Sequence, residues 1–413
     1  MSRTSISLEP VVQKHPRVVN VAVAVIYYQD QYLLGYRNSE QHQGDRYEFV
    51  GGKIDSEETA TAALIRETAE ETGIDISANT AVKLGRLHHD YGDKQVCLQV
   101  YKVALTAEQY QQYKHCDCGL EGQALTWVDK PSLVNNHYPL PAANQTILTW
   151  LKLPEQITIT QPLAHFKRSQ GSEQDLVNEA AQQWLAYHQP KLPSKGWCYL
   201  RLKTATLQAQ NSDDIEADII RQLLELRADI SVIIPYKMGK TIYLANYLAK
   251  HVQGETVSSK PNVKGDSLPI SAYHLTHNEL MTWFASYQRQ KQHLLDNKIS
   301  NTDLNLLKLD NCTATTGLIV SCHDSASIKA ANQLAQLRLL QGLAPVIAIF
   351  LSPVLATNSH PDSPALGWQQ WSALAQLADM PVIALGGLAP TMLATAIEYG
   401  ASSVAGISSF LKG

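Results

Sequence analysis

The segment from Gly51 to Ile74 (GGKIDSEETATAALIRETAEETGI) restricts the fold of this chain more than any other stretch. It opens with two glycines and then becomes rich in good helix formers, so we expect a helix that begins after Ser56. Asp55, followed three residues later by Glu58, resembles a capping box. Gly73 lies where such a helix would end. The pattern predicts a glycine turn that leads directly into one helix.

Three carboxylates share one face of this predicted helix. Glu67, Glu70 and Glu71 stand at positions i, i+3 and i+4. Like charges at this spacing cost roughly 0.2–0.5 kcal/mol per pair, unless a divalent cation with oxygen ligands turns the repulsion into a binding site. An acidic helix face exposed to water is the other interpretation, and the three residues alone do not decide between the two.

The spacing around the carboxylates resembles the Nudix box. Gly52, five residues, Glu58, seven residues and then the run from Arg66 to Ile74 match the box over 23 positions, with Thr68 as the one mismatch where the family has an aliphatic residue. The resemblance implies a site for Mg²⁺ or Mn²⁺. Its expected ligands are the Gly51 carbonyl, Glu67, Glu70, Glu71 and Glu121.

Composition bounds the other possibilities. A length of 413 residues suggests two or three domains, and an apolar fraction of 45% suffices for ordinary cores. The formal net charge of −4 gives no reason to expect duplex nucleic acid as a partner. Cys116 and Cys118 form a C-x-C without a second pair, which favours neither a zinc site nor a disulfide framework. No signal core and no run of about 18 apolar residues occurs, so we expect no membrane partner and a cytoplasmic location.

The first part of the chain, residues 1–153, alternates strands with helices and predicts an α/β sandwich. Apolar and β-branched runs indicate strands, and polar Gly or Asp positions separate them. The long Nudix-like helix lies between these strands. The expected strands are Val18–Tyr28, Tyr32–Arg37, Tyr47–Val50, Val82–His89, Val96–Val103 and Ala124–Val128, and a closing helix is expected at Ala143–Trp150.

Residues outside the box resemble the MutT branch of the Nudix family, which hydrolyses oxidised guanine nucleotides. The run YEFVGGKI at 47–54 is similar to that branch's entry to the box, and the segment 141–144 is similar to the one that presents a base-reading asparagine. Asp93 follows a turn of the same kind. The resemblance implies substrate contacts at Arg37, His42, Glu48, Phe49, Lys94 and Asn144.

The roles implied by this resemblance agree with phosphate chemistry. Divalent cations neutralise charge on a phosphate chain and lower the pKa of a bound water. Glu67 is placed to contact a metal and take the proton from the attacking water. Arg66 should hold the glutamates by ion pairing, and we favour the same supporting role for Glu58. The branch implies attack at the β-phosphorus, which yields a nucleoside monophosphate and pyrophosphate.

Base selection rests on Asn144. Oxidation of guanine at C8 places a hydrogen on N7, and an amide with one donor and one acceptor matches the resulting edge. Such pairing discriminates by as much as about 10⁴-fold. Phe49 would pack near the base and Arg37 could add a polar contact. The alternatives are an N-cap role for Asn144 and a surface salt bridge for Arg37.

The remainder, residues 154–413, predicts a (β/α)₈ barrel of the TIM type. Short β-rich runs alternate with helical stretches after Leu153-Pro154, and the site of such a barrel lies at the carboxyl ends of its strands. The expected strands are Ile157–Thr160, Cys198–Lys203, Ser231–Pro235, Ile270–Leu275, Gly317–Ser321, Val346–Leu351, Pro381–Leu385 and Ser403–Ile407. The expected helices include Glu173–His188, Asp214–Arg227, Ala326–Gln341 and Gly367–Ala378.

The barrel resembles thiamin phosphate synthase and its relative TenI, the thiazole tautomerase. The glycine turns near the end of the chain, the run Tyr199–Lys203 and the strand end at His274 carry the likeness. It implies phosphate binding at backbone N–H groups of Gly386, Gly387, Ile407 and Ser408, although tight βα turns would have the same sequence. His323 matches a histidine of the tautomerase and is a candidate proton shuttle, or a structural histidine.

The departures from that family restrict what the barrel does. The run Ile233–Lys237 has no carboxylate at the position where the synthase has a magnesium-binding aspartate, and the run Thr357–His360 has no lysine. Glu279 is the candidate replacement for the second acidic ligand. A degenerate barrel that binds a phosphorylated thiazole-like or thiamin-related ligand, or that only braces the chain, is therefore as consistent with the sequence as a catalytic one.

Three functions follow. The leading hypothesis is a metal-dependent hydrolase that converts 8-oxo-dGTP to 8-oxo-dGMP and pyrophosphate, and so prevents mutagenic incorporation during DNA replication. The second is a Nudix hydrolase of another diphosphate, such as a nucleotide sugar or a thiamin-related pyrophosphate, with an active thiamin-pathway barrel. The third is a non-enzymatic role in which the barrel binds or scaffolds.

Overall fold

The computed structural model describes residues 18–40, 43–92, 94–166, 173–203, 212–238, 270–297, 314–357 and 364–411. Two sheets divide these residues along the chain, an open sheet in the first part and a closed barrel in the second. The fold is therefore the mixed α/β architecture that the sequence predicts. The boundary at Leu153-Pro154 stays a prediction.

The first sheet has the order β3-β2-β1-β5-β4, and β6 pairs with β2. Its two longest neighbours, β1 and β5, run parallel, with Val18 opposite Gln95. β4 pairs antiparallel with β5 and forms one edge. All six expected strands are confirmed. The strands are β1 (Val18–Tyr28), β2 (Gln31–Arg37), β3 (Arg46–Glu48), β4 (Ala81–Asp90), β5 (Gln95–Ala104) and β6 (Leu125–Asp129).

Helix α1 (Ala60–Thr72) begins later than the sequence suggested. Its N-cap is Thr59, whose side chain accepts a hydrogen bond from the Ala62 N–H. The helix start expected from Asp55 and Glu58 is wrong: Glu58 accepts the Asp55 N–H as in a capping box, but this bond closes the turn before the helix, which begins after Thr59. The predicted end is confirmed, since Gly73 caps the helix with φ 76°.

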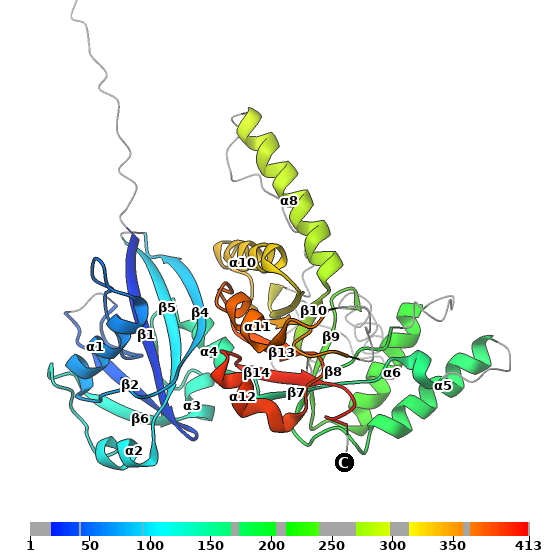
Figure 1. Cartoon of the computed structure of the whole chain (residues 1–413), viewed down its shortest axis with the longest axis horizontal. Coiled ribbons are helices and arrows are strands. Elements are labelled where there is room, and N and C mark those ends of the chain that lie inside the picture. The colour runs from blue at the N-terminus through cyan, green and yellow to red at the C-terminus, as the bar shows by residue number, and fades with distance from the viewer. Residues whose placement is uncertain are drawn as a thin grey trace, which may run out of the picture.

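Helices cover both faces of this sheet. α1 packs on one face against Ala22, Ile26 and Leu33. The other face, with Val23 and Leu34, belongs to a core that continues into the barrel. Figure 1 shows α1 on the side of the sheet away from the barrel and α4 between the sheet and the barrel. The other helices of this unit are α2 (Ala107–Tyr113), α3 (Lys130–Val134) and α4 (Asn144–Leu151).

The second part closes into an eight-stranded barrel in the order β10-β11-β12-β13-β14-β7-β8-β9, all parallel. Buried aliphatic side chains such as Ile157, Ile233 and Ile319 fill its interior. The predicted barrel is confirmed. Its strands are β7 (Gln156–Ile159), β8 (Trp197–Tyr199), β9 (Ser231–Pro235), β10 (Ile270–Leu275), β11 (Leu318–Cys322), β12 (Val346–Leu351), β13 (Val382–Leu385) and β14 (Ser403–Gly406).

The helices around the barrel agree with the predicted ones to within a few residues. Figure 1 shows these helices around the barrel strands, with α8 extending away from them. Those in the described residues are α5 (Glu173–His188), α6 (Ser212–Leu226), α8 (His277–Asn297), α10 (Ser325–Leu340), α11 (Gly367–Ala375) and α12 (Leu393–Glu398), with 3₁₀ turns at Leu163–Phe166 and Pro390–Met392. Within the described residues, no helix is both long enough and apolar enough to cross a membrane.

The edge strand β4 packs directly on the barrel. The Arg86 N–H donates to the Asp379 carbonyl at 3.2 Å, and the Arg86 guanidinium pairs with the Asp379 carboxylate at 3.0 Å. Lys83 Nζ donates to the Gln376 carbonyl at 2.8 Å. A backbone bond combined with side-chain bonds fixes the register of this edge and covers strand donors that would otherwise face solvent.

Candidate active site

The glycine loop before α1 lies along β1. The N–H groups of Ala22 and Ala24 donate to the carbonyls of Gly52 and Val50 at 2.9 and 2.8 Å. Gly51, between them, has φ 140°, a conformation that a side chain would strain. Its N–H donates to Glu71 Oε2 at 3.1 Å, and among the described residues its carbonyl accepts no hydrogen bond. The carbonyl expected to bind metal is therefore not used by the fold.

Arg66 binds the acidic side chains of the turn and the helix. Its Nε and Nη2 donate to Glu58 at 3.0 and 2.8 Å, and its Nη1 donates to Glu67 at 2.8 Å and to Glu70 at 3.1 Å. These bonds raise the pKa of Arg66 and lower the pKa of Glu58. The geometry is that of the supporting roles predicted for Arg66 and Glu58.

Glu71 lies where negative charge is concentrated. Burial raises the pKa of its carboxyl to about 8, and the carboxylates of Glu48, Glu67 and Glu121 add to the rise while the Gly51 N–H opposes it. Three acidic neighbours around a half-buried carboxyl destabilise its charged form. A cation among them would remove that penalty.

No three acidic, histidine or cysteine side chains in the described residues converge closely enough to hold a metal ion. The carboxylates bond instead to nearby donors: Arg66 donates to Glu67 and Glu70, and the Gly51 N–H donates to Glu71. The donor set still suits the group, since carboxylate and carbonyl oxygens are the ligands of Mg²⁺ and Mn²⁺. Glu67, Glu71 and the Gly51 carbonyl are the residues that would hold it, with the more exposed Glu70 and Glu121 beside them.

Arg37 and Glu48 form an ion pair between β2 and β3. Burial raises the pKa of Glu48, and Arg37 opposes that rise. Both side chains are about one-quarter exposed, so the pair is neither on the open surface nor sealed in the core. Because Glu48 also acts on Glu71, the pair connects the expected nucleotide pocket to the acidic cluster.

Asn144 is the first residue of α4, and Ala143 is the N-cap of that helix. The alternative in which Asn144 is the N-cap is therefore wrong. The Asn144 side chain is 7% exposed, and among the described residues its amide has no hydrogen-bond partner. The Asn144 amide atoms are not among the fully buried polar atoms that lack a partner, so the amide is accessible and free to bond to a ligand.

The glycine turns of the barrel lie at the carboxyl ends of β13 and β14. Gly386 and Gly387 have φ values of 108° and 69° and pack against the loop that follows β12. The Leu355 N–H donates to the Gly386 carbonyl at 3.0 Å. Within the described residues the N–H groups of Gly386, Gly387, Ile407 and Ser408 donate no hydrogen bond, so all four could serve an anion.

The other barrel candidates divide into an exposed and a buried group. His323 is exposed, its Nδ1 contacts the Ser352 carbonyl at 2.8 Å, and its ring lies 4.8 Å from that of His277. Inside the barrel, His274 bonds to the hydroxyls of Tyr199 at 2.7 Å and Ser321 at 2.8 Å. Burial lowers the pKa of His274 to about 3, so this imidazole stays neutral. Its two hydrogen bonds fix the hydroxyls of Tyr199 and Ser321 inside the barrel.

A Nudix domain model matches residues 21–150, the part of the chain that contains the open sheet, the glycine loop and the acidic helix. The N-terminal unit is a Nudix domain. A thiamine monophosphate synthase model matches residues 298–410, which include the last four barrel strands, and this part is a domain of the thiamine monophosphate synthase/TenI type.

Several relatives resemble the Nudix domain. An 8-oxo-dGTP diphosphatase of Proteus vulgaris is 37% identical over 71 residues, which is 17% of this chain and 62% of that relative's length. In Escherichia coli, an 8-oxo-dGTP diphosphatase is 27% identical over 32% of this chain and 96% of the relative, and a CTP pyrophosphohydrolase is 26% identical over 32% of this chain and 90% of the relative. The solved E. coli ORF135 protein is 26% identical over 32% of this chain and 87% of that chain, with a TM-score of 0.26.

The barrel has its own relative. A putative thiamine-phosphate synthase 2 of Aquifex aeolicus is 36% identical over 64 residues, which is 16% of this chain and 34% of the relative. The match therefore covers a minor part of that protein, and it carries no conclusion about catalysis by this barrel.

Sequence reasoning missed two residues that build the Nudix site. The Glu71 carbonyl accepts the Leu120 N–H at 2.8 Å and the Gln123 amide at 3.0 Å, and these bonds place the loop with Glu121 beside the end of α1. Tyr91 lies between the backbone of Ala143 and the charges of Arg37 and Arg46; burial raises its pKa and these groups oppose the rise. Gln123 has no local signal in the sequence, whereas Tyr91 is marked only as an aromatic residue directly before the Gly92 turn.

Four other candidates are placed differently or lie outside the described residues. Phe49 is 3% exposed and packs in the core, so little of its surface is accessible to a base. Lys94 is half-buried and its carbonyl accepts the Tyr91 N–H at 2.9 Å. His42 and Asp93 lie outside the described residues. Their roles stay predictions.

Proposed function

We propose that the Nudix domain hydrolyses oxidised purine nucleoside triphosphates, with 8-oxo-dGTP converted to 8-oxo-dGMP and pyrophosphate. The observation that carries the proposal is the Asn144 amide, which forms no hydrogen bond among the described residues and directly follows Ala143, whose backbone bonds to Tyr91 beside Arg37 and Glu48. Two relatives named 8-oxo-dGTP diphosphatase support it. We further propose that the substrate is met in the nucleotide pool, which makes the domain a sanitation enzyme.

The chain's own residues supply positioning and proton transfer. Arg66 holds Glu67 and Glu58 in fixed orientations, and the Gly51 N–H orients Glu71. A bound Mg²⁺ or Mn²⁺ would neutralise the phosphate oxygens and acidify a water. Glu67 then takes the proton of the attacking water, because its carboxylate already lies beside the glycine loop.

The base is selected by matched hydrogen bonds. The Asn144 amide offers a donor to O6 and an acceptor to the N7 hydrogen of an 8-oxopurine, whereas N7 of ordinary guanine would face the amide oxygen with a lone pair. A mismatch of this kind leaves buried polar groups unpaired and costs about 1–3 kcal/mol or more. The site would therefore accept both nucleotides and prefer the oxidised one.

Product identification tests the proposal. The full chain is incubated with Mg²⁺ and with 8-oxo-dGTP, dGTP or CTP, and the products are separated. We expect nucleoside monophosphate and pyrophosphate, formed fastest from 8-oxo-dGTP. Glu71→Gln should abolish turnover of every nucleotide, whereas Asn144→Ala should lower the preference for 8-oxo-dGTP over dGTP by about tenfold or more. Glu108→Gln and Gln145→Ala, at exposed positions on α2 and α4, are the matched controls.

The same assay separates the competing substrates. Because one relative is a CTP pyrophosphohydrolase, faster turnover of CTP than of 8-oxo-dGTP would replace the oxidised purine by a pyrimidine. Preference for a nucleotide sugar or for thiamin diphosphate would favour the second hypothesis. No turnover of any of these with Mg²⁺ or Mn²⁺ would refute hydrolysis.

A further inference from the structure

Two opposite sides of helix α4 are in contact with other parts of the protein. One face of α4 is a buried stripe at the i, i+3, i+4, i+7 spacing, made of Asn144, Ile147, Leu148 and Leu151. Thr146 and Trp150 lie one turn apart on the opposite side and face the barrel. The helix that carries the proposed base-reading amide is therefore held between two domains.

Trp150 is the contact between α4 and the barrel. Its side chain is 4% exposed, and its Nε1–H donates to the Val346 carbonyl at the start of β12 at 3.2 Å. The ring tip packs on Gly85 of β4 so closely that a Cβ there would lie less than 3.0 Å from it. Among the described residues this is the hydrogen bond that joins α4 to the barrel.

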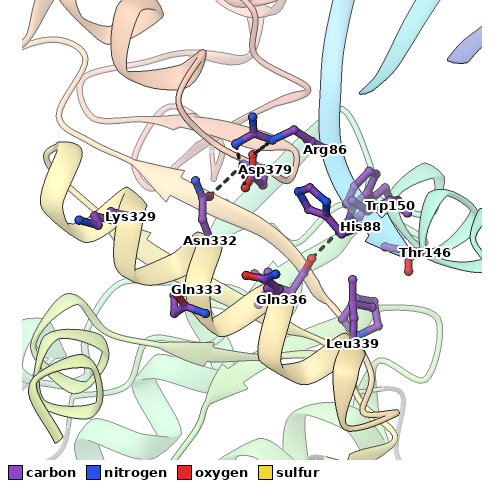
Figure 2. A pocket seen from close by; sticks show the side chains of 14 residues that line it. Arg86, His88, Thr146, Trp150, Lys329, Asn332, Gln333, Gln336, Leu339 and Asp379 are labelled. Carbon is purple, nitrogen blue, oxygen red and sulfur yellow. Dashed lines mark hydrogen bonds and ion pairs between the residues drawn. The ribbon is translucent and has the colours of Figure 1, made fainter. Parts of the chain in front are cut away.

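The surroundings of Trp150 provide little other support for α4. A cavity of about 260 Å³ lies between α4 and α10, and Figure 2 shows Thr146 and Trp150 on one side of it and Asn332, Gln336 and Leu339 on the other. The Arg86–Asp379 pair beside the cavity holds β4, not α4. Among the described residues, the Trp150 indole thus supplies the one hydrogen bond between α4 and the barrel, beside their shared apolar core.

We propose that Trp150 is a positioning residue, through which the barrel fixes α4 and thereby Asn144. This inference rests on the proposed function of the Nudix domain. The catalytic carboxylates lie on α1, on the other face of the sheet, so a change at Trp150 acts on base recognition and leaves the hydrolytic step unaffected. The barrel is in this respect a structural part of the nucleotide site.

The test uses two identical substitutions in the full chain. Trp150→Phe removes the bond to Val346 at one end of β12, and Trp371→Phe removes an equivalent bond, from the Trp371 indole to the Leu351 carbonyl at 2.9 Å, at the other end. We expect Trp150→Phe to raise KM for 8-oxo-dGTP and to lower the preference over dGTP by about threefold to tenfold, the equivalent of one hydrogen bond, with kcat unchanged. Trp371→Phe should change neither.

Amide hydrogen exchange of residues 144–151 is measured in parallel, without substrate. Trp150→Phe should speed this exchange and Trp371→Phe should not. Equal effects of both variants on exchange or on preference would overturn the proposal, because they would report general destabilisation. So would no effect of Trp150→Phe on exchange. If the unaltered protein shows no preference for 8-oxo-dGTP, the substrate proposal fails, whereas faster exchange confined to Trp150→Phe still supports the positioning role.

Discussion

Gly52 and Glu67 are packed so closely that a Cβ atom on Gly52 would lie less than 3.0 Å from the Glu67 carboxylate. The obstacle is the end of a flexible side chain, so Gly52→Ala would displace the carboxylate and leave the backbone in place. We expect nucleotide hydrolysis to fall by about 10²-fold or more, as for a misplaced proton acceptor, and the melting temperature to stay almost unchanged. Steady-state kinetics and thermal unfolding on one preparation check both.

Gly51→Ala is the contrasting variant. There the φ of 140° is unfavourable for alanine, and the added Cβ would meet the backbone carbonyl of Ala22, which cannot move without breaking the sheet. This variant should lose stability as well as activity. If Gly52→Ala unfolded as readily as Gly51→Ala, the separation of a catalytic from a structural glycine would be wrong.

Thr68, the one departure from the Nudix box, is fully buried, and its hydroxyl has no hydrogen-bond partner among the described residues. Thr68→Val keeps the shape and removes the unpaired group, so it should raise the free energy of unfolding by about 1 kcal/mol. Thr72→Val is the matched control, because the Thr72 hydroxyl donates to the Thr68 carbonyl at 2.6 Å and accepts the Ile74 N–H at 3.1 Å. Urea unfolding should show opposite signs for the two.

The elements that could be predicted from sequence are those with a strong local pattern. The β-branched run of β1 and seven of the eight barrel strands were expected at nearly the observed bounds, because burial on both faces leaves a continuous apolar signature. The exception is β8, which ends at Tyr199 and not at the expected Lys203. The start of α1 was misplaced, because the Asp55–Glu58 bond closes the turn before the helix, whereas the Thr59 side chain accepts the Ala62 N–H and caps the helix itself.

The parts of the site that sequence could not supply come from tertiary contacts. Gln123 reaches the Glu71 carbonyl across 52 positions of the chain, and Trp150 reaches Val346 across 196. Spacing rules apply to neighbours on one helix or strand. They therefore predicted that Glu67, Glu70 and Glu71 share one helix face, but they could not predict the bonds of Gln123 and Trp150 to distant parts of the chain. An ion pair between Arg66 and the glutamates was predicted from the sequence. Which guanidinium nitrogen bonds to Glu67 could be seen only in the structure.

His188 makes the stability of the barrel depend on pH. Its Nδ1 bonds to the Trp184 carbonyl at 2.8 Å and its Nε2 accepts the Gln161 N–H at 3.0 Å, an arrangement that only the neutral ring satisfies. Burial lowers the pKa of His188 to about 4 from 6.5. Because the pKa of His188 is lower in the folded protein than in the unfolded chain, the unfolded chain binds the proton first as the pH falls. The contribution of His188 to the free energy of unfolding is therefore complete above about pH 6.5 and is lost as the pH falls towards 4. The loss amounts to about 3 kcal/mol at most.

His188→Gln isolates this contribution. The difference in unfolding free energy between pH 7 and pH 4, measured with urea, should be smaller in the variant than in the unaltered protein by up to about 3 kcal/mol. His115→Gln, at an exposed position on the Nudix domain, should leave the difference unchanged. Parallel pH profiles for all three proteins would show that His188 does not titrate as its contacts require.

The last prediction concerns synthesis of thiamin phosphate by the barrel. At the end of β9, where the resemblance would require a carboxylate for magnesium, Lys237 pairs with Asp213 at 3.2 Å, so a cation already neutralises the nearby acid. A Mg²⁺ ion at this position would meet repulsion from this ammonium, and Asp213 is already paired and not free to bind it. Incubation of the full chain with thiazole phosphate, pyrimidine pyrophosphate and Mg²⁺ should therefore yield no thiamin phosphate by chromatography, and Lys237→Asp alone should not create the activity. Formation of thiamin phosphate by the unaltered chain, lost on Gly387→Ala, would establish a catalytic barrel instead.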